Sequence, residues 1–322
     1  QSMTTAPFGS WSSPITADLI VSKSVSIGEV FVGGDDVWWS EARPEEGGRV
    51  QLVRHRPGGG AIDVLPEEFG ARTRVHEYGG GAWWLHGSDV VFVNWSDQCL
   101  YRLAAGTSTP TPLTPEPADR HGDRYADGRF TADGRWVVCV RERHESADAE
   151  PINEIVAVRV HHNGEPAEPV VLVSGSDCVA APRVSPSGNV LTWFRWNHPD
   201  MPWDGTELCV ASMYDDQSDD GQIVVGDTRV VAGGRDESIT QPEWAPDGSL
   251  LFISDRTDWW NLYQVSAEAV HELVANGVGA DATPIAPVDA EIGVPQWVFD
   301  NSRYAVLADG RILVAWFKLG ID

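Results

Sequence analysis

Short apolar segments recur along the chain, each directly after a small turn that contains glycine. Within a segment, apolar residues alternate with polar ones or run together briefly, which predicts β-strands rather than helices. The turns contain Gly34, Gly87, Gly134, Gly188, Gly248 and Gly310, and the segments that follow are DDVWWSEA, SDVVFVNW, RWVVCVRE, NVLTWFRW, SLLFISDR and RILVAWFK. These glycines lie 53, 47, 54, 60 and 62 residues apart, a spacing typical of the four-stranded blades of a β-propeller.

Each of the third, fourth and fifth repeats contains four strand-like runs separated by polar or glycine turns. In the third repeat these runs are YADGRFTADG, RWVVCVRERH, NEIVAVRVHH and AEPVVLVSG. Only SAEAVHELVANG (266–277) has a helical pattern. The sixth repeat makes two strands before the sequence ends at Asp322. The sequence therefore predicts an all-β propeller of four-stranded antiparallel blades, with about five complete blades and a partial sixth.

Composition limits the classes of partner that the protein is expected to bind and the compartment in which we expect it. The 322 residues carry a net charge of −25, which makes nucleic acid and anionic membranes unlikely partners on electrostatic grounds. No apolar run approaches the roughly 20 residues of a spanning helix, and no signal peptide is recognisable, so we expect a cytoplasmic protein. Gln1 and Ser2 precede Met3 and look like a tag remnant. We therefore assign residues 1–10 to this remnant and an N-terminal arm, and residues 11–322 to the propeller.

The aromatic residues and cysteines are expected to be structural. Fifteen tryptophans are unusually many, and a large flat ring fills the wedge between twisted blades well. We expect this packing role for Trp38, Trp39, Trp83, Trp84, Trp136, Trp193, Trp244 and Trp297. The four cysteines form no CxxC pair, which favours free thiols in the core over disulfides or a zinc site. They are Cys99, Cys139, Cys178 and Cys209.

The sequence contains no recognisable catalytic or metal-binding motif. GxSxG and HExxH are absent, and the nine histidines show no metal-ligand spacing. The glycine triplets at 58–60 and 79–81 do not open helices, which argues against phosphate binding. We therefore expect no catalytic residue, no metal and no cofactor in this chain.

Blade topology places the unusual polar segments on one face. In an antiparallel blade, the start of the first strand and the loop between the second and third strands lie on the same side of the disc. RTRVHEY (72–78) precedes an innermost strand, whereas RERHES (141–146), WNHPDMPWD (196–204) and SDRTDWW (254–260) connect second and third strands. Because binding groups tend to lie on loops held by a rigid scaffold, we interpret this as the functional face.

Several long motifs carry a family resemblance. RTRVHEYGGGAW, HPDMPWDGTEL, DRTDWWNLY and GVPQWVF together resemble the N-terminal propeller of bacterial serine peptidases of the prolyl oligopeptidase family, in its acylaminoacyl peptidase and dipeptidyl aminopeptidase-like branch. The similarity runs from about Trp11 to the end of the sequence. In that family a seven-bladed propeller caps an α/β-hydrolase domain with a Ser-His-Asp triad and restricts access to short peptides.

The resemblance implies a gating role without catalysis. No residue here matches the triad, so we expect the chain alone to be inactive, with a peptide as the ligand of the whole enzyme. The candidates for binding a peptide terminus or carbonyl, or for bracing the domain interface, are Arg72, Arg74, His76, Glu77, Tyr78, Arg141, Arg143, His198, Trp203, Asp204 and Arg256. Hydrogen bonding between blades is an alternative role for these side chains.

Two other functions remain open at this stage. The chain could be a non-catalytic scaffold for protein interaction, resembling the propeller that accompanies colicin import. A lyase acting on acidic sugars is a weaker alternative, because it would require a metal held by clustered histidines. For the unpaired strand edges of an open ring, we expect self-association, cover by the N-terminal segment, or disorder.

Overall fold

The computed structural model describes residues 24–117, 122–146, 148–160, 165–215 and 221–318, and seven isolated earlier positions, Pro7, Gly9, Ser10, Ser13, Ile15, Thr16 and Leu19. The tag remnant and the expected start of the propeller at Trp11 lie outside the described residues. The chain divides into two compact units, residues 1–64 and residues 65–322. Within the described residues, no helix is both long and apolar enough to cross a membrane.

The first unit contains one four-stranded antiparallel sheet, the first blade. Its strands follow one another in the order β1 (Ser26–Gly33), β2 (Asp36–Arg43), β3 (Arg49–His55) and β4 (Ala61–Asp63). A short 3-10 helix, η1 (Pro44–Glu46), connects β2 to β3 and ends at Gly47, whose φ of 69° is the left-handed conformation that glycine adopts readily. Arg43 at the end of β2 pairs with Asp63 of β4 at 2.6 Å, which links these two strands across β3.

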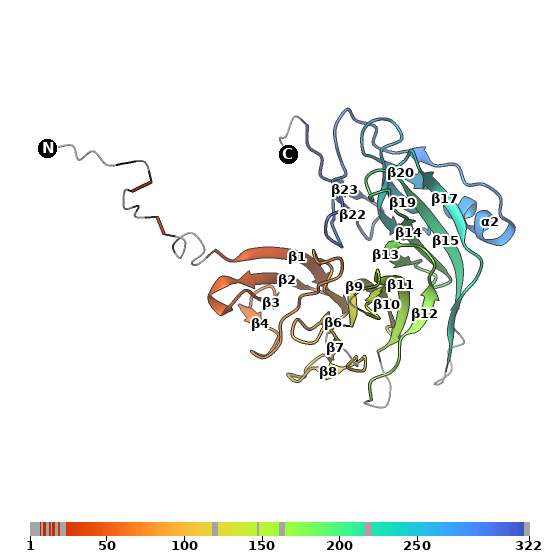
Figure 1. Cartoon of the computed structure of the whole chain (residues 1–322). Coiled ribbons are helices and arrows are strands. Elements are labelled where there is room, and N and C mark those ends of the chain that lie inside the picture. Colours follow the sequence, from red (N-terminus) through yellow and green to blue (C-terminus); the bar gives the residue numbers. More distant parts are fainter. Residues whose placement is uncertain are drawn as a thin grey trace. The chain divides into compact units, whose positions relative to one another are not determined.

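The second unit contains four further blades, each an antiparallel sheet (Figure 1). The second blade consists of β5 (Trp83–His86), β6 (Asp89–Val93), β7 (Leu100–Leu103) and β8 (Thr111–Pro112). The third blade consists of β9 (Asp123–Phe130), β10 (Trp136–Arg143), β11 (Ile152–Arg159) and β12 (Val170–Val173). Within this unit, the innermost strands of consecutive blades lie next to one another, which is the arrangement of a propeller.

The fourth blade differs from the expected four strands at its outer edge. It consists of β13 (Cys178–Val184), β14 (Val190–Trp196), β15 (Thr206–Asp215) and two shorter strands, β16 (Ile223–Val225) and β17 (Arg229–Gly234). Both shorter strands pair with β15, one at each end, so the outermost strand of this blade is interrupted. The sequence pattern predicted only the second of them.

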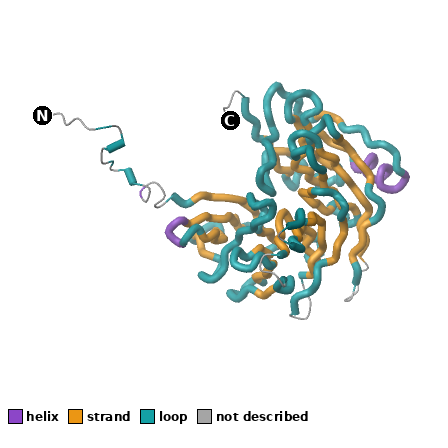
Figure 2. The backbone as a smooth tube through the Cα atoms, in the orientation of Figure 1, coloured by secondary structure: helices purple, strands orange, loops and turns teal. Residues whose placement is uncertain are grey.

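The fifth blade carries the predicted helix. Its strands are β18 (Ile239–Trp244), β19 (Leu250–Ser254), β20 (Asn261–Val265) and β21 (Thr283–Pro284). The helix α2 (Ala267–Asn276) begins after Ser266, whose side chain accepts a hydrogen bond from the Ala269 amide, and ends at Gly277. It lies beside β15 and β17 of the fourth blade (Figure 2). The last two strands, β22 (Tyr304–Val306) and β23 (Ile312–Val314), form the partial sixth sheet.

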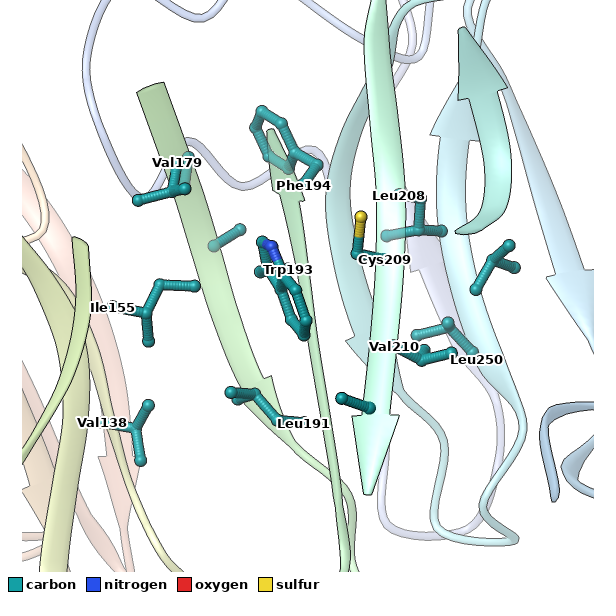
Figure 3. Packing of buried hydrophobic residues seen from close by; sticks show 14 of the residues in the cluster. Val138, Ile155, Val179, Leu191, Trp193, Phe194, Leu208, Cys209, Val210 and Leu250 are labelled. Atoms are coloured by element: carbon teal, nitrogen blue, oxygen red, sulfur yellow. The ribbon is translucent and has the colours of Figure 1, made fainter. Parts of the chain in front are cut away.

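The largest core cluster lies between the third, fourth and fifth blades. Figure 3 shows Trp193 of β14 among Val138 and Ile155 of the third blade and Val210 of β15. Trp84 and Trp136 are also buried in clusters that join neighbouring blades, as predicted. The prediction is wrong for Trp297, which is 51% exposed. The four cysteines are free thiols, and three of them are fully buried.

The innermost strands of three blades are tied by charges. Arg183 of β13 donates to Asp127 of β9 at 3.0 Å and to Glu243 of β18 at 2.9 Å. Arg129 of β9 bonds Asp300, which precedes β22, at 2.6 Å. Arg183 and Asp127 are almost fully buried, so these ion pairs fix the blades at the centre of the second unit.

Gly80 brings the end of the chain back to the second blade. Its backbone forms a parallel bridge with Phe299, and the Phe299 amide donates to the Gly79 carbonyl at 2.9 Å. Gly80 has a φ of 92°, and a Cβ there would lie 2.5 Å from the Phe299 carbonyl oxygen.

We expect Gly80→Ala to lower the free energy of unfolding by more than the roughly 1 kcal/mol that a positive φ costs on its own. The matched control is Gly87→Ala, because Gly87 has a φ of 62° but open space around its Cβ position. Urea denaturation followed by tryptophan fluorescence measures both variants. Equal losses for the two would show that the contact with Phe299 is not tight.

Candidate functional site

A pocket of about 430 Å³ opens where the predicted functional face lies. Its walls come from the turn before β5, the start of β9, the loops that follow β10 and β14, and the segment before β22. Three of the four segments singled out in the sequence contribute side chains to it, namely residues 72–78, 141–146 and 196–204. The segment 254–260 does not line it.

The turn before β5 has a tightly wound backbone. His76 and Glu77 adopt positive φ values of 53° and 63°, and the three glycines that follow have positive φ as well. The Glu77 amide donates to the Arg74 carbonyl at 2.8 Å, and the Gly79 amide donates to the Val75 carbonyl at 3.0 Å. Such conformations persist where surrounding contacts over-determine them, and they are common at binding sites. The glycine triplet therefore shapes this turn rather than a phosphate cradle.

Hydrogen bonds to the third blade hold the turn in place. The His76 amide donates to Glu142 Oε2 at 2.8 Å, and its ring nitrogen Nε2 lies 3.0 Å from Asn153 Oδ1. Arg124 at the start of β9 donates to the Arg74 carbonyl at 3.0 Å and to Glu77 Oε1 at 2.7 Å. The floor of the pocket is therefore a network between two blades.

Arg124 also shapes the electrostatics of the pocket. Its guanidinium holds the pKa of Glu77 below the usual range, because the hydrogen bond between them stabilises the charged carboxylate. It lies 3.1 Å from Glu142, a buried carboxylate that also bonds His144 at 2.7 Å. Four carboxylates line the pocket, those of Glu77, Glu142, Glu150 and Asp177, whereas Arg124 is the single guanidinium among the lining residues and pairs with the first two. The pocket thus favours a cationic ligand group.

Aromatic rings form the opposite wall. Trp297 lies 4.6 Å from Trp203 and 5.5 Å from Tyr78, measured between ring centroids. Tyr78 is 62% exposed although it is large and partly apolar. Trp196 adds a ring 6.2 Å from His76. Exposed aromatic rings beside carboxylates can contact an apolar side chain and a cation at the same time.

The loop after β14 is held by carboxylates at both ends. Asp177 Oδ2 accepts a hydrogen bond from the His198 amide at 2.8 Å, and Asp204 Oδ2 accepts one from the Met201 amide at 2.9 Å. His198 and Trp203 then line the pocket, whereas Asp204 braces the loop.

Burial raises the pKa of the Cys178 thiol, which also lines the pocket, to about 12, so this group is protonated at neutral pH and is a poor nucleophile.

The structure brings five of the predicted residues together in the pocket, which are His76, Glu77, Tyr78, His198 and Trp203. The other candidates have different surroundings. Arg141 is buried against Glu154 at 2.5 Å, and Arg143 pairs with Glu145 at 3.4 Å. Arg256 pairs with Glu237 at 2.7 Å. Arg72 and Arg74 both lie over the ring of Trp95.

The sequence analysis missed several residues of the pocket. It selected no segment that contains Arg124, Glu150, Asn153 or Asp177, and it assigned Trp297 to the packing between blades. Glu142, His144 and Trp196 lie within the selected segments but were not among the candidate residues. Arg124 stands at the start of an innermost strand, so the same topological argument that selected residues 72–78 could have found it. The surrounding sequence of Trp297, PQWVF, resembles that of Trp244, QPEWAP. Because Trp244 packs against the core, no sequence pattern distinguished the pocket residue Trp297 from a core residue.

We expect Arg124→Gln to raise the pKa of Glu77 toward its ordinary value, because the hydrogen bond that stabilises its carboxylate is lost. A carboxyl ¹³C NMR titration of Glu77 measures this change. Arg256→Gln, which lies outside the pocket, should leave the titration of Glu77 unaltered. An unchanged Glu77 pKa in Arg124→Gln would contradict the central role of Arg124.

In the part of the chain that is described, no group of three or more His, Cys, Asp or Glu side chains could hold a metal ion. The sequence matches no protein-family model, and a search of curated proteins found no match either.

Solved structures do match the chain. A puromycin-hydrolysing peptidase from Mycobacterium tuberculosis is 40% identical over 97% of this chain, with a TM-score of 0.81. A puromycin hydrolase is 37% identical over 97% of the chain, with the same TM-score. The chain spans 46% and 47% of these two proteins.

More distant matches show the fold alone. A prolyl endopeptidase is 12% identical, with a TM-score of 0.61 over 91% of this chain and 40% of its own length. An oligogalacturonate lyase from Vibrio parahaemolyticus is 11% identical, with a TM-score of 0.60. The closer similarity, at 37% to 40% identity over nearly all of this chain, is to peptidases. We therefore identify the chain as a β-propeller of the prolyl oligopeptidase family, equivalent to the N-terminal part of its peptidases.

Proposed function

We propose that this chain is the non-catalytic, substrate-gating propeller of a serine peptidase that cleaves short peptides. The observation that carries the proposal is the pocket, which combines four carboxylates with exposed aromatic rings on one face of the second unit. The similarity to two puromycin-hydrolysing proteins supports an amide substrate of small size. Since the chain spans less than half of these relatives, the catalytic groups would belong to another domain.

The charge of the pocket favours a free amino terminus as the bound group. An ammonium group forms charge-assisted hydrogen bonds with carboxylates and is attracted to the faces of aromatic rings. Glu150 is an exposed carboxylate of the pocket with no hydrogen bond or ion pair in the described part of the chain. The side chain of Asp177 is also exposed and bonds only His198 there. Between the two activities that the resemblance implies, the pocket therefore favours a dipeptidyl or aminopeptidase type over an acylaminoacyl type.

The size of the pocket supports a gating role. A cavity of about 430 Å³ accepts a few residues of an extended peptide but not a folded domain. The hydrogen bonds that link the turn before β5 to the third blade make it a preformed site. We propose that it receives the amino-terminal end of the substrate and limits access of larger chains to the active site.

Calorimetric titration of the chain with the tripeptide Phe-Gly-Gly tests this proposal. We expect N-acetyl-Phe-Gly-Gly to bind at least about tenfold more weakly, because acetylation removes the positive charge. Glu150→Gln should weaken binding of the free tripeptide and leave the acetylated one unchanged. Glu268→Gln, the same charge change on α2, is the control. Equal binding of both peptides, or no binding of either, would contradict the proposal.

A further inference from the structure

Two arginines lie over one tryptophan beside the pocket. The guanidinium carbon of Arg72 is 4.3 Å from the centroid of the Trp95 ring, and that of Arg74 is 4.5 Å away. Thr73 between them is buried, so the two arginine side chains extend to the same side of this extended segment. Trp95 belongs to the loop between β6 and β7, on the face that also carries the pocket.

A buried glutamine fixes this arrangement. Gln98 is completely buried, and its Oε1 accepts a hydrogen bond from the Arg74 amide at 2.8 Å. Its Nε2 donates to the Trp95 carbonyl at 3.1 Å and to the Arg72 carbonyl at 3.5 Å. One side chain thus holds the backbone of all three residues. The backbone that carries the two arginines and the tryptophan is therefore fixed, and each guanidinium group rests on the Trp95 ring.

No carboxylate in the described part of the chain lies within 4 Å of either guanidinium group. Neither Arg72 nor Arg74 forms an ion pair there, although the protein has a net charge of −25. Arg256, which also lies over an aromatic ring, does pair with Glu237. Both guanidinium carbons lie within 4.5 Å of the same ring centroid, so two positive charges are held near each other and repel. A bound anion would relieve this repulsion, and a carboxylate matches the planar guanidinium group well.

The pair of arginines adjoins the acidic pocket. Arg124 donates to the carbonyl of Arg74 and to the carboxylate of Glu77, so the two regions share one side chain. The positive charge of Arg74 also helps to lower the pKa of Glu77, which shows that the two charges are near each other. Acidic groups on one side and basic groups on the other match the charges at the two ends of a short peptide.

We propose that Arg72 and Arg74 bind the α-carboxylate of a short peptide whose ammonium group lies in the pocket. This inference rests on the proposed function, and it adds the class of ligand, which is a short peptide with both termini free. The pair would favour such peptides over longer chains, whose carboxylate lies too far from the amino terminus to reach both sites.

Titration of the chain with Phe-Gly-Gly and with its C-terminal amide tests the inference. We expect the amide to bind at least about tenfold more weakly, because it cannot form charged hydrogen bonds with the arginines. In the double variant Arg72→Gln/Arg74→Gln, the free acid should bind as weakly as the amide, so the preference disappears. Circular dichroism establishes that the variant is folded.

Arg159→Gln is the matched control, because Arg159 lies over Trp136 at 4.5 Å but does not line the pocket. It should keep the preference for the free acid. Equal binding of acid and amide to the natural chain would overturn the carboxylate site, as would a preference that survives in the double variant. If acid and amide bind equally but the acetylated tripeptide binds more weakly than the free one, the proposed ammonium pocket is supported and only the proposed carboxylate site is contradicted.

Discussion

Replacing Arg183 with methionine is expected to lower the free energy of unfolding of the second unit by about 3–5 kcal/mol, because it leaves the buried carboxylate of Asp127 without its cation and removes one of the two cations beside Asp300. Asp127 and Asp300 both lie within 3.3 Å of this guanidinium, and their side chains are 1% and 8% exposed. Guanidinium chloride denaturation followed by tryptophan fluorescence measures the loss.

The pH dependence of this loss has a definite sign. Burial on its own raises the pKa of Asp300, but Arg129 and Arg183 together hold it below the ordinary value. The stabilisation from the charged Asp300 is therefore present above the pKa of the unfolded chain and is lost as the pH falls through the folded value. Without Arg183 the pKa of Asp300 rises, so the difference between the variant and the natural chain should shrink once the pH falls below the raised pKa of the variant, and should disappear only below the lowered pKa of the natural chain.

Arg195→Met is the control for this experiment. Arg195 pairs with Glu207 at 2.8 Å, but the two side chains are 32% and 41% exposed, and such pairs contribute at most about 1 kcal/mol. Equal losses in the two variants would mean that the charges around Arg183 do not hold the blades together.

Replacing Trp297 with alanine is expected to weaken the binding of Phe-Gly-Gly by about 10-fold to 30-fold. Trp297 contacts both Trp203 and Tyr78, so its removal takes away the centre of the aromatic wall. Aromatic side chains at the centre of a binding site commonly contribute about 2 kcal/mol or more. Calorimetric titration measures the change.

The matched control is Trp316→Ala. Trp316 is 52% exposed, compared with 51% for Trp297, and it does not line the pocket. Its loss removes the same amount of exposed indole without touching the site. If both variants bound the tripeptide as tightly as the natural chain, the aromatic wall would have no role in binding.

The fold could be predicted from the sequence because its signals are local and repeated. Each glycine turn and each alternating strand occurs several times, so an error in one repeat is corrected by the others. The helix α2 was also predictable, since Ser266 and Gly277 mark its ends. The interruption between β16 and β17 was not, because it depends on how β15 pairs along its length.

The pocket was predictable only in part. Strand connectivity correctly grouped three loop segments on one face, and the turn at His76 and Glu77 was recognised by its motif. The roles of individual side chains were harder to predict from the sequence, because they depend on partners far away in the sequence. Arg141 looked like a candidate but is neutralised by Glu154, and Arg124 looked ordinary but connects Glu77 with Glu142. Trp297 shares a motif with a core residue, and only its surroundings distinguish it.

The reading frame that encodes this chain tests the central claim, that the propeller is the substrate-facing part of a serine peptidase. Sequencing the gene beyond the codon for Asp322 should reveal the rest of the propeller and an α/β-hydrolase domain with a GxSxGG nucleophile motif. The match of the chain to less than half of its peptidase relatives supports this expectation. A stop codon directly after Asp322, with no such domain in the gene, would contradict it.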